Sequence, residues 1–455
     1  MQHFDLALIG SGSGNSIADD RFADLSVALI DKGVFGGTCL NVGCIPTKMF
    51  VHPADLAASP GHAGKLGVDL EVRAVRFAEI RDRIFARIDP ISDGGLKWRK
   101  SNENVTVFSE AAHFLDPHTL QVGEQLVTAD QFVLAAGSRP VIPELPGLET
   151  VRYHTSDTVM RLPELPRSMV IVGGGYIAAE FSHIFSSYGT AVTVVNRGER
   201  MLNREDGEVS ARFTELISRR VDLRTCSTVA DVRPAAGGGV TVGIVGPAGR
   251  QEVTADVLLV ATGRRPNGDT LALDAAGVEL DDDGYVVVDA HQRTTAEHIW
   301  ALGDVSSPDQ LKHVANHEAR VVQHNLLHPD GLVESDHRFV PHAVFSDPQV
   351  AAVGLTEQQA RAQGLDYATA TQDYGDVAFG WAMEDTDHFV KLISDKATGL
   401  LVGAHLVGPE ASSLIQPLIQ AMSFGQRPRD VARGQYWIHP AMAEVVENAL
   451  LQLPS

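Results

Sequence analysis

Residues 4–14 read FDLALIGSGSG, an apolar run that predicts a buried strand, followed at once by a glycine-rich turn. A second apolar run, Ser26 to Ile30, predicts the next strand, and the acid Asp31 follows it. A strand, a Gly-x-Gly turn and a distant acid are typical of a dinucleotide-binding unit. The turn and the N-terminus of a following helix hold a pyrophosphate, and the acid holds a ribose. Asn15 stands where a third glycine is usual, which bears on helix–strand packing. The alternative interpretation is that these glycines serve only the packing of a helix on a strand and bind no nucleotide.

The same pattern returns at residues 168–178, SMVIVGGGYIA. Here the following strand ends at Asn196-Arg197 and not in an acid, so the usual grip on a free ribose 2′-hydroxyl is missing. Arg197, with Arg200 and Arg204 nearby, can pair with a 2′-phosphate, which favours NADPH over NADH. The alternative is that these arginines are only solvent-exposed side chains of a loop and bind no nucleotide.

Other segments outline the domains. Residues 72–100 have helical periodicity, which Pro90 is expected to break or kink. A proline-rich stretch at 140–147 predicts a linker, and residues 235–250 a flexible hairpin-like insertion. From about Pro341 the chain has strands and then helices without a glycine-rich phosphate loop, which indicates a third domain.

The length, charge and cysteine content of the chain exclude several classes of function. The chain has 455 residues, too many for one hydrophobic core, and a formal net charge of −21, which disfavours nucleic acid and anionic membranes as partners. No apolar run approaches the ~20 residues of a membrane span. A strand predicted at the very start leaves no room for a signal peptide, so we expect a cytoplasmic protein. Three cysteines are too few for a secreted disulfide scaffold.

Two of these cysteines lie in GGTCLNVGCIPTK, residues 36–48. In a regular helix Cys39 and Cys44 would be about 7.5 Å apart along the axis. A disulfide needs Cα atoms within about 7 Å, so the segment must bend, and Gly43 and Pro46 make a bend plausible. We interpret the pair as a redox-active disulfide, with a metal site or a structural disulfide as alternatives. Cys226 is expected to be a structural free thiol.

The cysteine segment resembles the active-site helix of the flavin-dependent pyridine nucleotide–disulfide oxidoreductases. The resemblance covers the whole chain in order: the cysteines, the second glycine turn, ALGD at 301–304 and His439-Pro440. It implies an α/β fold with two Rossmann-like dinucleotide-binding domains and a C-terminal α+β dimerisation domain. The expected domains are an FAD-binding domain (1–145 and 265–335), an NADPH-binding domain (146–264) and an interface domain (336–455).

The resemblance also implies catalytic roles. Cys39 is the interchange thiol that attacks the substrate disulfide. Cys44 is the thiol beside the flavin, which forms a thiolate-to-flavin charge-transfer complex and resolves the mixed disulfide. Lys48 is the lysine near the flavin, and Glu180 is its acidic partner beside the nicotinamide.

His439 is implied to be the catalytic histidine and Glu444 the acid that orients it. In the family this histidine serves the cysteines of the other subunit, so a homodimer is expected. A thiol needs a base, and a carboxylate fixes the imidazole tautomer.

The cofactor-binding residues implied for FAD and NADPH come from the same motifs. For FAD they are Gly10, Ser11, Gly12, Ser13, Gly14, Asp31, Lys32, Gly37, Thr38, Lys48, Ala112, Gly137, Gly303, Asp304 and His313. For the nicotinamide nucleotide they are Gly173, Gly174, Gly175, Ile177, Arg197, Arg204 and Gly263. No metal is expected, and His317 and His342 are expected to have structural roles.

Comparison with the different members of the family indicates which disulfide is the substrate. Trp437 and Asn196 stand where dihydrolipoamide dehydrogenases carry a histidine and an acid. Residues 441–443 differ from glutathione reductases, and the chain lacks the terminal cysteine pair of mercuric reductases. Segments 10–16, 46–50, 311–320 and 438–441 are similar to the mycothione reductases, which implies mycothione (mycothiol disulfide) as the small-molecule substrate. The alternatives are a dihydrolipoamide dehydrogenase-like NAD flavoprotein and a non-catalytic redox-sensing flavoprotein.

Overall fold

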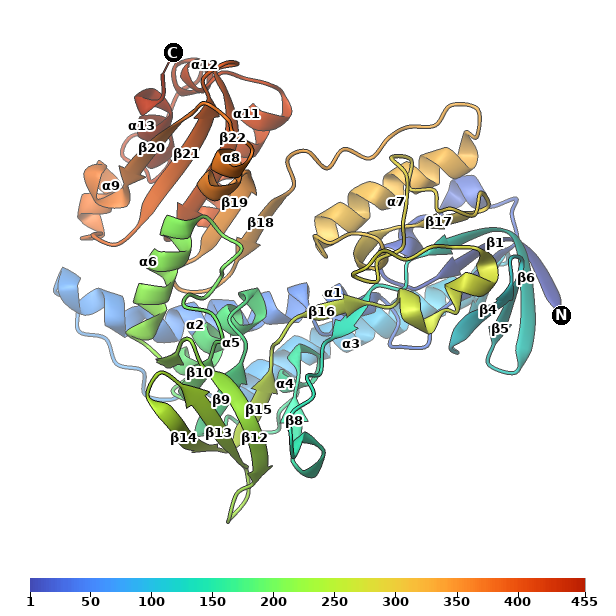
Figure 1. Ribbon diagram of the computed structural model, residues 1–455, viewed down its shortest axis with the longest axis horizontal. Helices are drawn as coiled ribbons and strands as arrows, with labels where there is room; N and C mark the ends of the chain where they lie inside the picture. Colours follow the sequence, from blue (N-terminus) through green and yellow to red (C-terminus); the bar gives the residue numbers. More distant parts are fainter. Residues whose placement is uncertain (455) are drawn as a thin grey trace. The chain divides into compact units, whose positions relative to one another are not determined.

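The computed structural model describes residues 1–454, and the chain falls into two compact units (Figure 1). Unit 1 comprises residues 1–47, 81–141 and 264–337, and unit 2 comprises residues 48–80, 142–263 and 338–455. The cuts near 141, 263 and 337 lie close to the boundaries expected from the sequence. Residues 48–80, however, group with unit 2. No helix within residues 1–454 is both long and apolar enough to cross a membrane.

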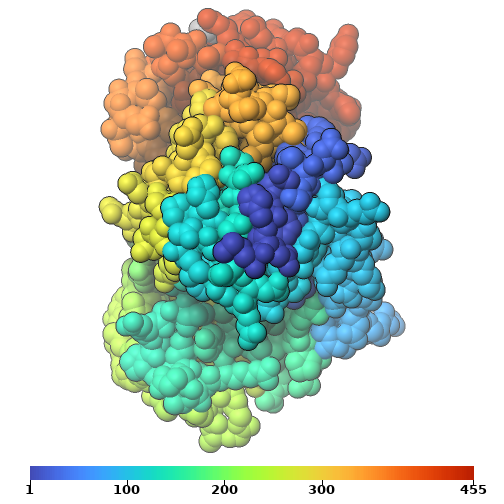
Figure 2. Space-filling model, turned by 90° about the vertical axis from the view of Figure 1, so that its right-hand side faces the viewer, coloured from blue at the N-terminus to red at the C-terminus, as the bar shows by residue number. Residues whose placement is uncertain are grey.

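Unit 1 is built on a seven-stranded sheet in the order β3-β2-β1-β6-β5-β4, with β17 also paired to β6. The first two strands were predicted correctly. β1 and β6 lie side by side as parallel partners, and Figure 2 shows the N-terminal strand beside residues of the 112–134 region. The strands are β1 (Gln2–Ile9), β2 (Val27–Ile30), β3 (Val105–Phe108), β4 (Ala112–Asp116), β5 (Thr119–Val122), β6 (Gln125–Leu134) and β17 (Ile299–Ala301).

Alternate side chains of β1 pack on opposite faces of this sheet. Leu6 and Leu8 belong to one buried cluster, whereas Ala7 and Ile9 belong to the cluster on the other face. Successive side chains of a strand point to opposite faces, so a strand with two buried faces reads as one continuous apolar run. The β2 sequence VALI is buried throughout for the same reason.

The connection between β1 and β2 differs from the prediction. We expected a helix after the glycine-rich turn, but the chain forms only the short 3₁₀ turns η1 (Gly14–Ser16) and η2 (Asp20–Phe22). Arg99 explains the difference. This 3% exposed side chain donates to the carbonyl oxygens of Asn15 and Ala18 and to the Asn15 side chain. In a helix, those carbonyls would accept from the backbone one turn on.

α1 and the start of α2 carry the cysteines, and α3 and α7 pack against one face of the sheet. α3 was expected from about residue 72 with a break or kink at Pro90. Instead it begins at Phe77 and continues through Pro90 as one helix. The predicted break of the helix at Pro90 was therefore wrong. α2 and α3 each extend from one unit into the other. The elements are α1 (Gly37–Asn41), α2 (Cys44–Ala63), α3 (Phe77–Ser101), η7 (Gly303–Val305), α7 (Lys312–Leu327) and the small β7–β16 pair (Ser138–Pro140, Arg264–Pro266).

Unit 2 contains two separate hydrophobic cores, one in residues 145–258 and one in residues 351–453. The first surrounds a parallel sheet in the order β11-β10-β9-β15-β8 and the three-stranded sheet β12-β13-β14. The predicted insertion at 235–250 belongs to the second of these sheets and ends in the β13–β14 hairpin. The elements are β8 (Tyr153–His154), α4 (Ser156–Val159), β9 (Ser168–Val172), α5 (Tyr176–Ser187), β10 (Ala191–Val195), α6 (Gly207–Ser218), β11 (Asp222–Arg224), β12 (Thr228–Pro234), β13 (Val240–Gly246), β14 (Gly249–Ala255) and β15 (Val257–Val260).

The last third of the chain forms strands and then mostly helices, as predicted. Its sheet has the order β18-β19-β22-β21-β20, and every neighbouring pair is antiparallel. Helices α11 to α13 pack on it (Figure 1). The elements are β18 (Pro341–Val344), β19 (Val350–Gly354), α8 (Glu357–Ala362), β20 (Tyr367–Asp373), α9 (Ala378–Ala382), β21 (Phe389–Asp395), β22 (Leu400–Val407), α10 (Ala411–Leu414), α11 (Gln416–Ser423), α12 (Pro428–Arg433) and α13 (Glu444–Gln452).

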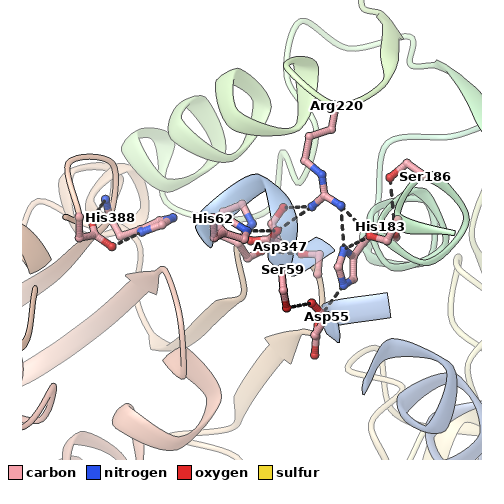
Figure 3. Close-up of polar contacts among 12 residues, drawn as sticks. Asp55, Ser59, His62, His183, Ser186, Arg220, Asp347 and His388 are labelled. Carbon is pink, nitrogen blue, oxygen red and sulfur yellow. Dashed lines mark hydrogen bonds and ion pairs between the residues drawn. The ribbon is translucent and has the colours of Figure 1, made fainter. Parts of the chain in front are cut away.

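A polar network joins α2, α5 and the start of the interface region within unit 2 (Figure 3). Arg220 donates to Asp347 (2.9 Å), which also pairs with His62 (2.9 Å). Buried His183 contacts Asp55 through Nε2 (2.7 Å) and Arg220 through Nδ1 (3.3 Å). A guanidinium can only donate, so Nδ1 of His183 accepts and Nε2 carries the proton.

Candidate active site

The two glycine-rich turns have the same backbone geometry. Gly10 (φ 114°) and Gly173 (φ 136°) both lie in the region that favours glycine. A Cβ at either would meet a carbonyl oxygen of the neighbouring strand end, Ala135 at 2.1 Å or Ala261 at 2.2 Å. Each glycine N–H also donates to the last residue of the next strand, Ile30 or Val195. The internal repeat predicted from the sequence is therefore confirmed at atomic level.

The first turn fits a dinucleotide. Asp31 accepts from the backbone N–H of Ser11 (2.8 Å) and from its hydroxyl (2.5 Å), which fixes the acid beside the turn. A Cβ at Gly37 would meet the Cα of Gly12 at 2.8 Å, so the start of α1 lies directly against the turn. Only glycines allow backbone to approach this closely, as a pyrophosphate cradle requires. The residues present fit the FAD site that the sequence implies.

Asp304, which the resemblance implies for FAD binding, is held by residues that the sequence did not predict. Its carboxylate accepts from Ser138 Oγ (2.6 Å), whose backbone and side chain in turn accept from Arg264. Buried Glu318 accepts from the Gly303 N–H (2.6 Å) and fixes the motif from α7. These partners lie far away in sequence, and no local signal could have identified them.

The other implied FAD contacts in unit 1 lie at its surface or at strand ends. Lys32, Thr38 and His313 are exposed, and Ala112 packs partly against the core at the start of β4. Gly137 has φ 67°, and its carbonyl accepts from the Asn267 N–H at 3.0 Å.

The cysteine segment bends at Gly43, as predicted, whereas Pro46 lies in the first turn of α2 and not at the bend. α1 ends at Asn41, Val42 has φ −144°, and α2 begins at Cys44. A Cβ at Gly43 would meet the Thr38 carbonyl oxygen at 2.9 Å, so the turn needs glycine. Cys39 and Cys44 are two thiols here and not a disulfide, and their side chains share a hydrogen bond. The pair is thus in contact in its reduced form.

The two thiols differ in environment. The hydrogen bond with Cys44 and burial raise the pKa of the Cys39 thiol, and the nearby positive charge of Lys312 acts in the opposite direction. Cys44 is exposed and occupies the first position of a 20-residue helix. A helix N-terminus stabilises a thiolate, so Cys44 is the better placed of the two to hold negative charge.

Lys48 and Glu180 meet within unit 2, as the resemblance implied. The Lys48 ammonium donates to both carboxylate oxygens of Glu180, at 2.7 and 2.8 Å. It also lies 4.6 Å from the ring centroid of Phe345, whose backbone N–H donates to Glu180 at 3.0 Å. The Glu180 side chain is only 6% exposed, so the ion pair is firmly oriented.

The second glycine turn is shaped by Asn196. Its amide donates to the carbonyl oxygens of Gly198 (3.0 Å) and Arg200 (2.9 Å) and so closes the loop that follows β10. A Cβ at Gly174 would meet Asn196 Oδ1 at 2.2 Å. Arg197 and Arg204 are exposed on this loop, whereas Arg200 donates to the Gly207 carbonyl (3.0 Å).

The remaining implied nucleotide contacts lie beside this turn. Gly175 is exposed at the N-cap of α5, and a Cβ there would point into open space among the described residues. Ile177 is half-buried in the first turn of that helix. Gly263, with φ 116°, is exposed beyond β15.

His439 and Glu444 form a close pair in unit 2. The His439 Nδ1 lies 2.7 Å from Glu444 Oε1. The carboxylate accepts, so Nδ1 carries the proton and Nε2 keeps its lone pair. The His439 side chain is 71% exposed, which leaves Nε2 accessible to another molecule. Of the other histidines, His342 pairs with Glu205 (2.7 Å) and His317 accepts from the Asp336 N–H (3.2 Å), in line with structural roles.

Comparison with known proteins agrees with this geometry. Residues 4–320 match the pyridine nucleotide-disulphide oxidoreductase family, and residues 340–450 match its dimerisation domain. The chain belongs to this family. It is a flavoprotein enzyme that uses FAD and NADPH to reduce a disulfide, as expected from its sequence.

Family members of several kinds align with the full chain. Mycothione reductase of Mycobacterium tuberculosis is 53% identical over 464 residues, and the match covers 100% of both chains. A dihydrolipoyl dehydrogenase of Geobacillus stearothermophilus is 31% identical, with 97% of this chain and 94% of that protein covered. The solved HOCl-induced flavoprotein disulfide reductase of Escherichia coli superposes with a TM-score of 0.86 at 28% identity, covering 99% of this chain and 100% of that chain.

Proposed function

We propose that this disulfide oxidoreductase reduces mycothione, the disulfide of mycothiol, with electrons from NADPH. The assignment of this substrate rests on the 53% identity to a mycothione reductase over the full length of both proteins. Dihydrolipoyl dehydrogenases share the fold at 31–33% identity, which supports the chemistry but not that substrate. The position two before His439 is Trp437, whose indole N–H donates to the Ala432 carbonyl, and not a second histidine.

The substrate half of the reaction uses the cysteine pair and His439. The Cys39 thiolate attacks one sulfur of the substrate disulfide, and the S–S bond breaks as the mixed disulfide forms. The leaving thiolate takes a proton from the His439 imidazolium. Cys44 then attacks the Cys39 sulfur, and neutral His439 takes the Cys44 proton and passes it to the second leaving sulfur, so that the second thiol is released and the Cys39–Cys44 disulfide remains. Bound FAD and NADPH supply the electron pair that returns this disulfide to two thiols.

The supporting residues position these groups. Glu444 holds the His439 tautomer through Nδ1, so Nε2 exchanges the proton with sulfur. The Lys48–Glu180 pair presents a fixed ammonium that the family places beside the flavin. The turns at Gly10–Gly14 and Gly173–Gly175 would hold the FAD and NADPH pyrophosphates, and Arg197 and Arg204 would face the 2′-phosphate.

A homodimer completes the site in this proposal. The dimerisation-domain match and the exposed His439 support a role for that histidine at the cysteines of the partner subunit. The adjacent Ile438 is also exposed, at 77%, and so is Phe424 of the same C-terminal region, at 76%. Such residues are typical of an interface. We place the enzyme in the cytoplasm because a working dithiol needs a reducing compartment.

The substrate is tested by NADPH oxidation with mycothione, glutathione disulfide and lipoamide in parallel. We expect strong turnover with mycothione alone and its loss in a Cys39→Ser variant. Turnover with lipoamide and a preference for NADH would favour the dihydrolipoamide dehydrogenase-like alternative. FAD retention without oxidation of NADPH by any of the three disulfides would favour the redox-sensing alternative. Either result would overturn the mycothione assignment.

A further inference from the structure

The FAD turn of this chain lacks the charge source that such turns normally have. The segment between β1 and β2 forms only η1 and η2, each of three residues. A full helix places roughly half a positive charge at its N-terminus by aligning many peptide dipoles. A single 3₁₀ turn aligns too few dipoles for this. A pyrophosphate with two negative charges therefore needs another cation at this turn.

Two side chains bring positive charge to the turn. Arg99 lies on its inner side and donates to neutral acceptors of Asn15 and Ala18. These bonded acceptors carry no charge, and Asp19, the acid whose charge also acts on the Arg99 guanidinium, is itself paired with Arg21. Arg99 also replaces the missing helical hydrogen bonds and so keeps the shortened turn in shape.

Lys312 reaches the turn from the first residue of α7. Its ammonium donates to Ser13 Oγ at 2.8 Å, and Ser13 Oγ donates to Asn316 Oδ1 at 3.1 Å, one helical turn further along α7. The first turn of α7 contains no acidic residue. The hydroxyl partner is neutral, so Lys312 keeps its full charge beside Ser13 of the glycine-rich turn.

We propose that Lys312 binds the pyrophosphate of FAD and supplies the positive charge that a helix N-terminus would otherwise supply there, while Arg99 positions the turn. The inference rests on the proposed placement of FAD at Gly10–Gly14. On binding, the ammonium exchanges Ser13 Oγ for a phosphate oxygen, which is a stronger, charge-assisted acceptor. The cation thus belongs to α7, some 300 residues away in sequence, and not to the motif itself.

The test uses full-length protein from which FAD has been removed. Quenching of flavin fluorescence gives the Kd for FAD, and displacement of FAD by ADP reports on the pyrophosphate without the flavin ring. Lys312→Met is expected to weaken both FAD and ADP by about ten- to a hundred-fold, as for the loss of a hydrogen bond to a charged group. It should also flatten the dependence of binding on salt concentration. Lys312→Arg should retain most of the affinity.

Arg320→Met is the matched control, because Arg320 is exposed on the same helix, and it should leave both affinities unchanged. Unchanged ADP affinity in Lys312→Met would overturn the inference, and so would a loss confined to FAD, which would place the lysine at the flavin ring. A wild-type apoprotein that binds no FAD would instead contradict the proposed function. Thermal unfolding of each apoprotein shows whether the variant is folded.

Discussion

At the residue scale, Asn196 shows how one amide shapes the loop assigned to the NADPH 2′-phosphate. An acid at this position is the usual NAD-type arrangement. Here the side-chain NH₂ donates to two backbone carbonyls, and the loop that presents Arg197 depends on both bonds. A carboxylate has no donor for either carbonyl and would repel both. The Asn196 amide therefore has a structural role in the loop, in addition to the absence of an acid at this position.

Asn196→Asp should raise the KM for NADPH by about ten-fold or more, because two hydrogen bonds are lost and the loop opens. The variant should not gain activity with NADH. Asn203→Asp, an exposed substitution in the same loop, adds the same charge and serves as the control. Steady-state kinetics with both nucleotides checks this expectation. A clear gain in NADH use by Asn196→Asp would show that residue 196 faces the ribose after all.

Residue-level prediction succeeded where a motif is local and missed long-range partners. The Cys39–Cys44 contact and the bend at Gly43 follow from the spacing of the two cysteines. The pairs Lys48–Glu180 and His439–Glu444 follow from the motifs of the family. Lys312 was missed because its link to the glycine-rich turn depends on the tertiary fold. The sequence marks the reacting groups but not the residues that hold them.

At the element scale, the segment after the first glycine turn shows a limit of local propensity. Its residues suit a helix, yet the Arg99 guanidinium takes the carbonyl oxygens of Asn15 and Ala18. Asp19 adds a local bond by accepting from the Arg21 N–H at 3.0 Å, which favours a turn. Since Arg99 comes from α3, the competition is invisible in a sequence window. Strands β1, β2, β9 and β10 were predictable because each is one short buried run.

The network of Figure 3 should make stability depend on pH. Burial acts to raise the pKa of Asp347, but His62 and Arg220 outweigh it and lower this pKa to about 2. The bond to Asp347 raises the pKa of His62 above its ordinary value. The carboxylate stabilises the fold above its unfolded pKa of about 3.9, and this is lost as pH falls towards 2. Protonated His62 stabilises below about 6.5, and this is lost as pH rises through its raised pKa.

Asp347→Asn should therefore lower the melting temperature by about 2–4 °C near pH 6 and by less near pH 3. His62→Gln should have a smaller effect, since the His62 side chain is 59% exposed and screened by solvent. Its effect should be largest near pH 6 and vanish at high pH. Thermal unfolding across this range measures both. An Asp347→Asn difference that grows as pH falls below 4 would contradict the assignment.

At the scale of the whole molecule, the repeat of two nucleotide-binding plans and the separate third region were visible in the sequence. The structure adds that residues 48–80 group with the second unit. Phe50 and Phe77 pack near Tyr188, and the Tyr188 hydroxyl donates to the Phe50 carbonyl at 2.7 Å. Apolar positions in a helix show that it packs but not on which partner, so this grouping was not predictable.

The proposed sharing of sites between subunits makes a prediction about mixed dimers. Cys39→Ser and His439→Gln homodimers should each be inactive with the disulfide substrate. After subunits are mixed and exchanged, half of the dimers are hybrids. If His439 acts on the partner's cysteines, one site of each hybrid is intact, so about a quarter of wild-type activity should return. No recovery despite hybrids seen by native mass spectrometry would place His439 and Cys39 of one chain in the same site.

The division of labour between the two thiols is the central claim, and single serine variants of the FAD-loaded enzyme test it most directly by their visible absorbance. With Cys39 replaced by serine, Cys44 is the one remaining thiol of the pair, and it stays at the start of α2, where a thiolate is favoured. Cys39→Ser should therefore show a long-wavelength band near neutral pH, from a thiolate against oxidised flavin, and Cys44→Ser should not. A band in Cys44→Ser and none in Cys39→Ser would reverse the two roles and contradict the account.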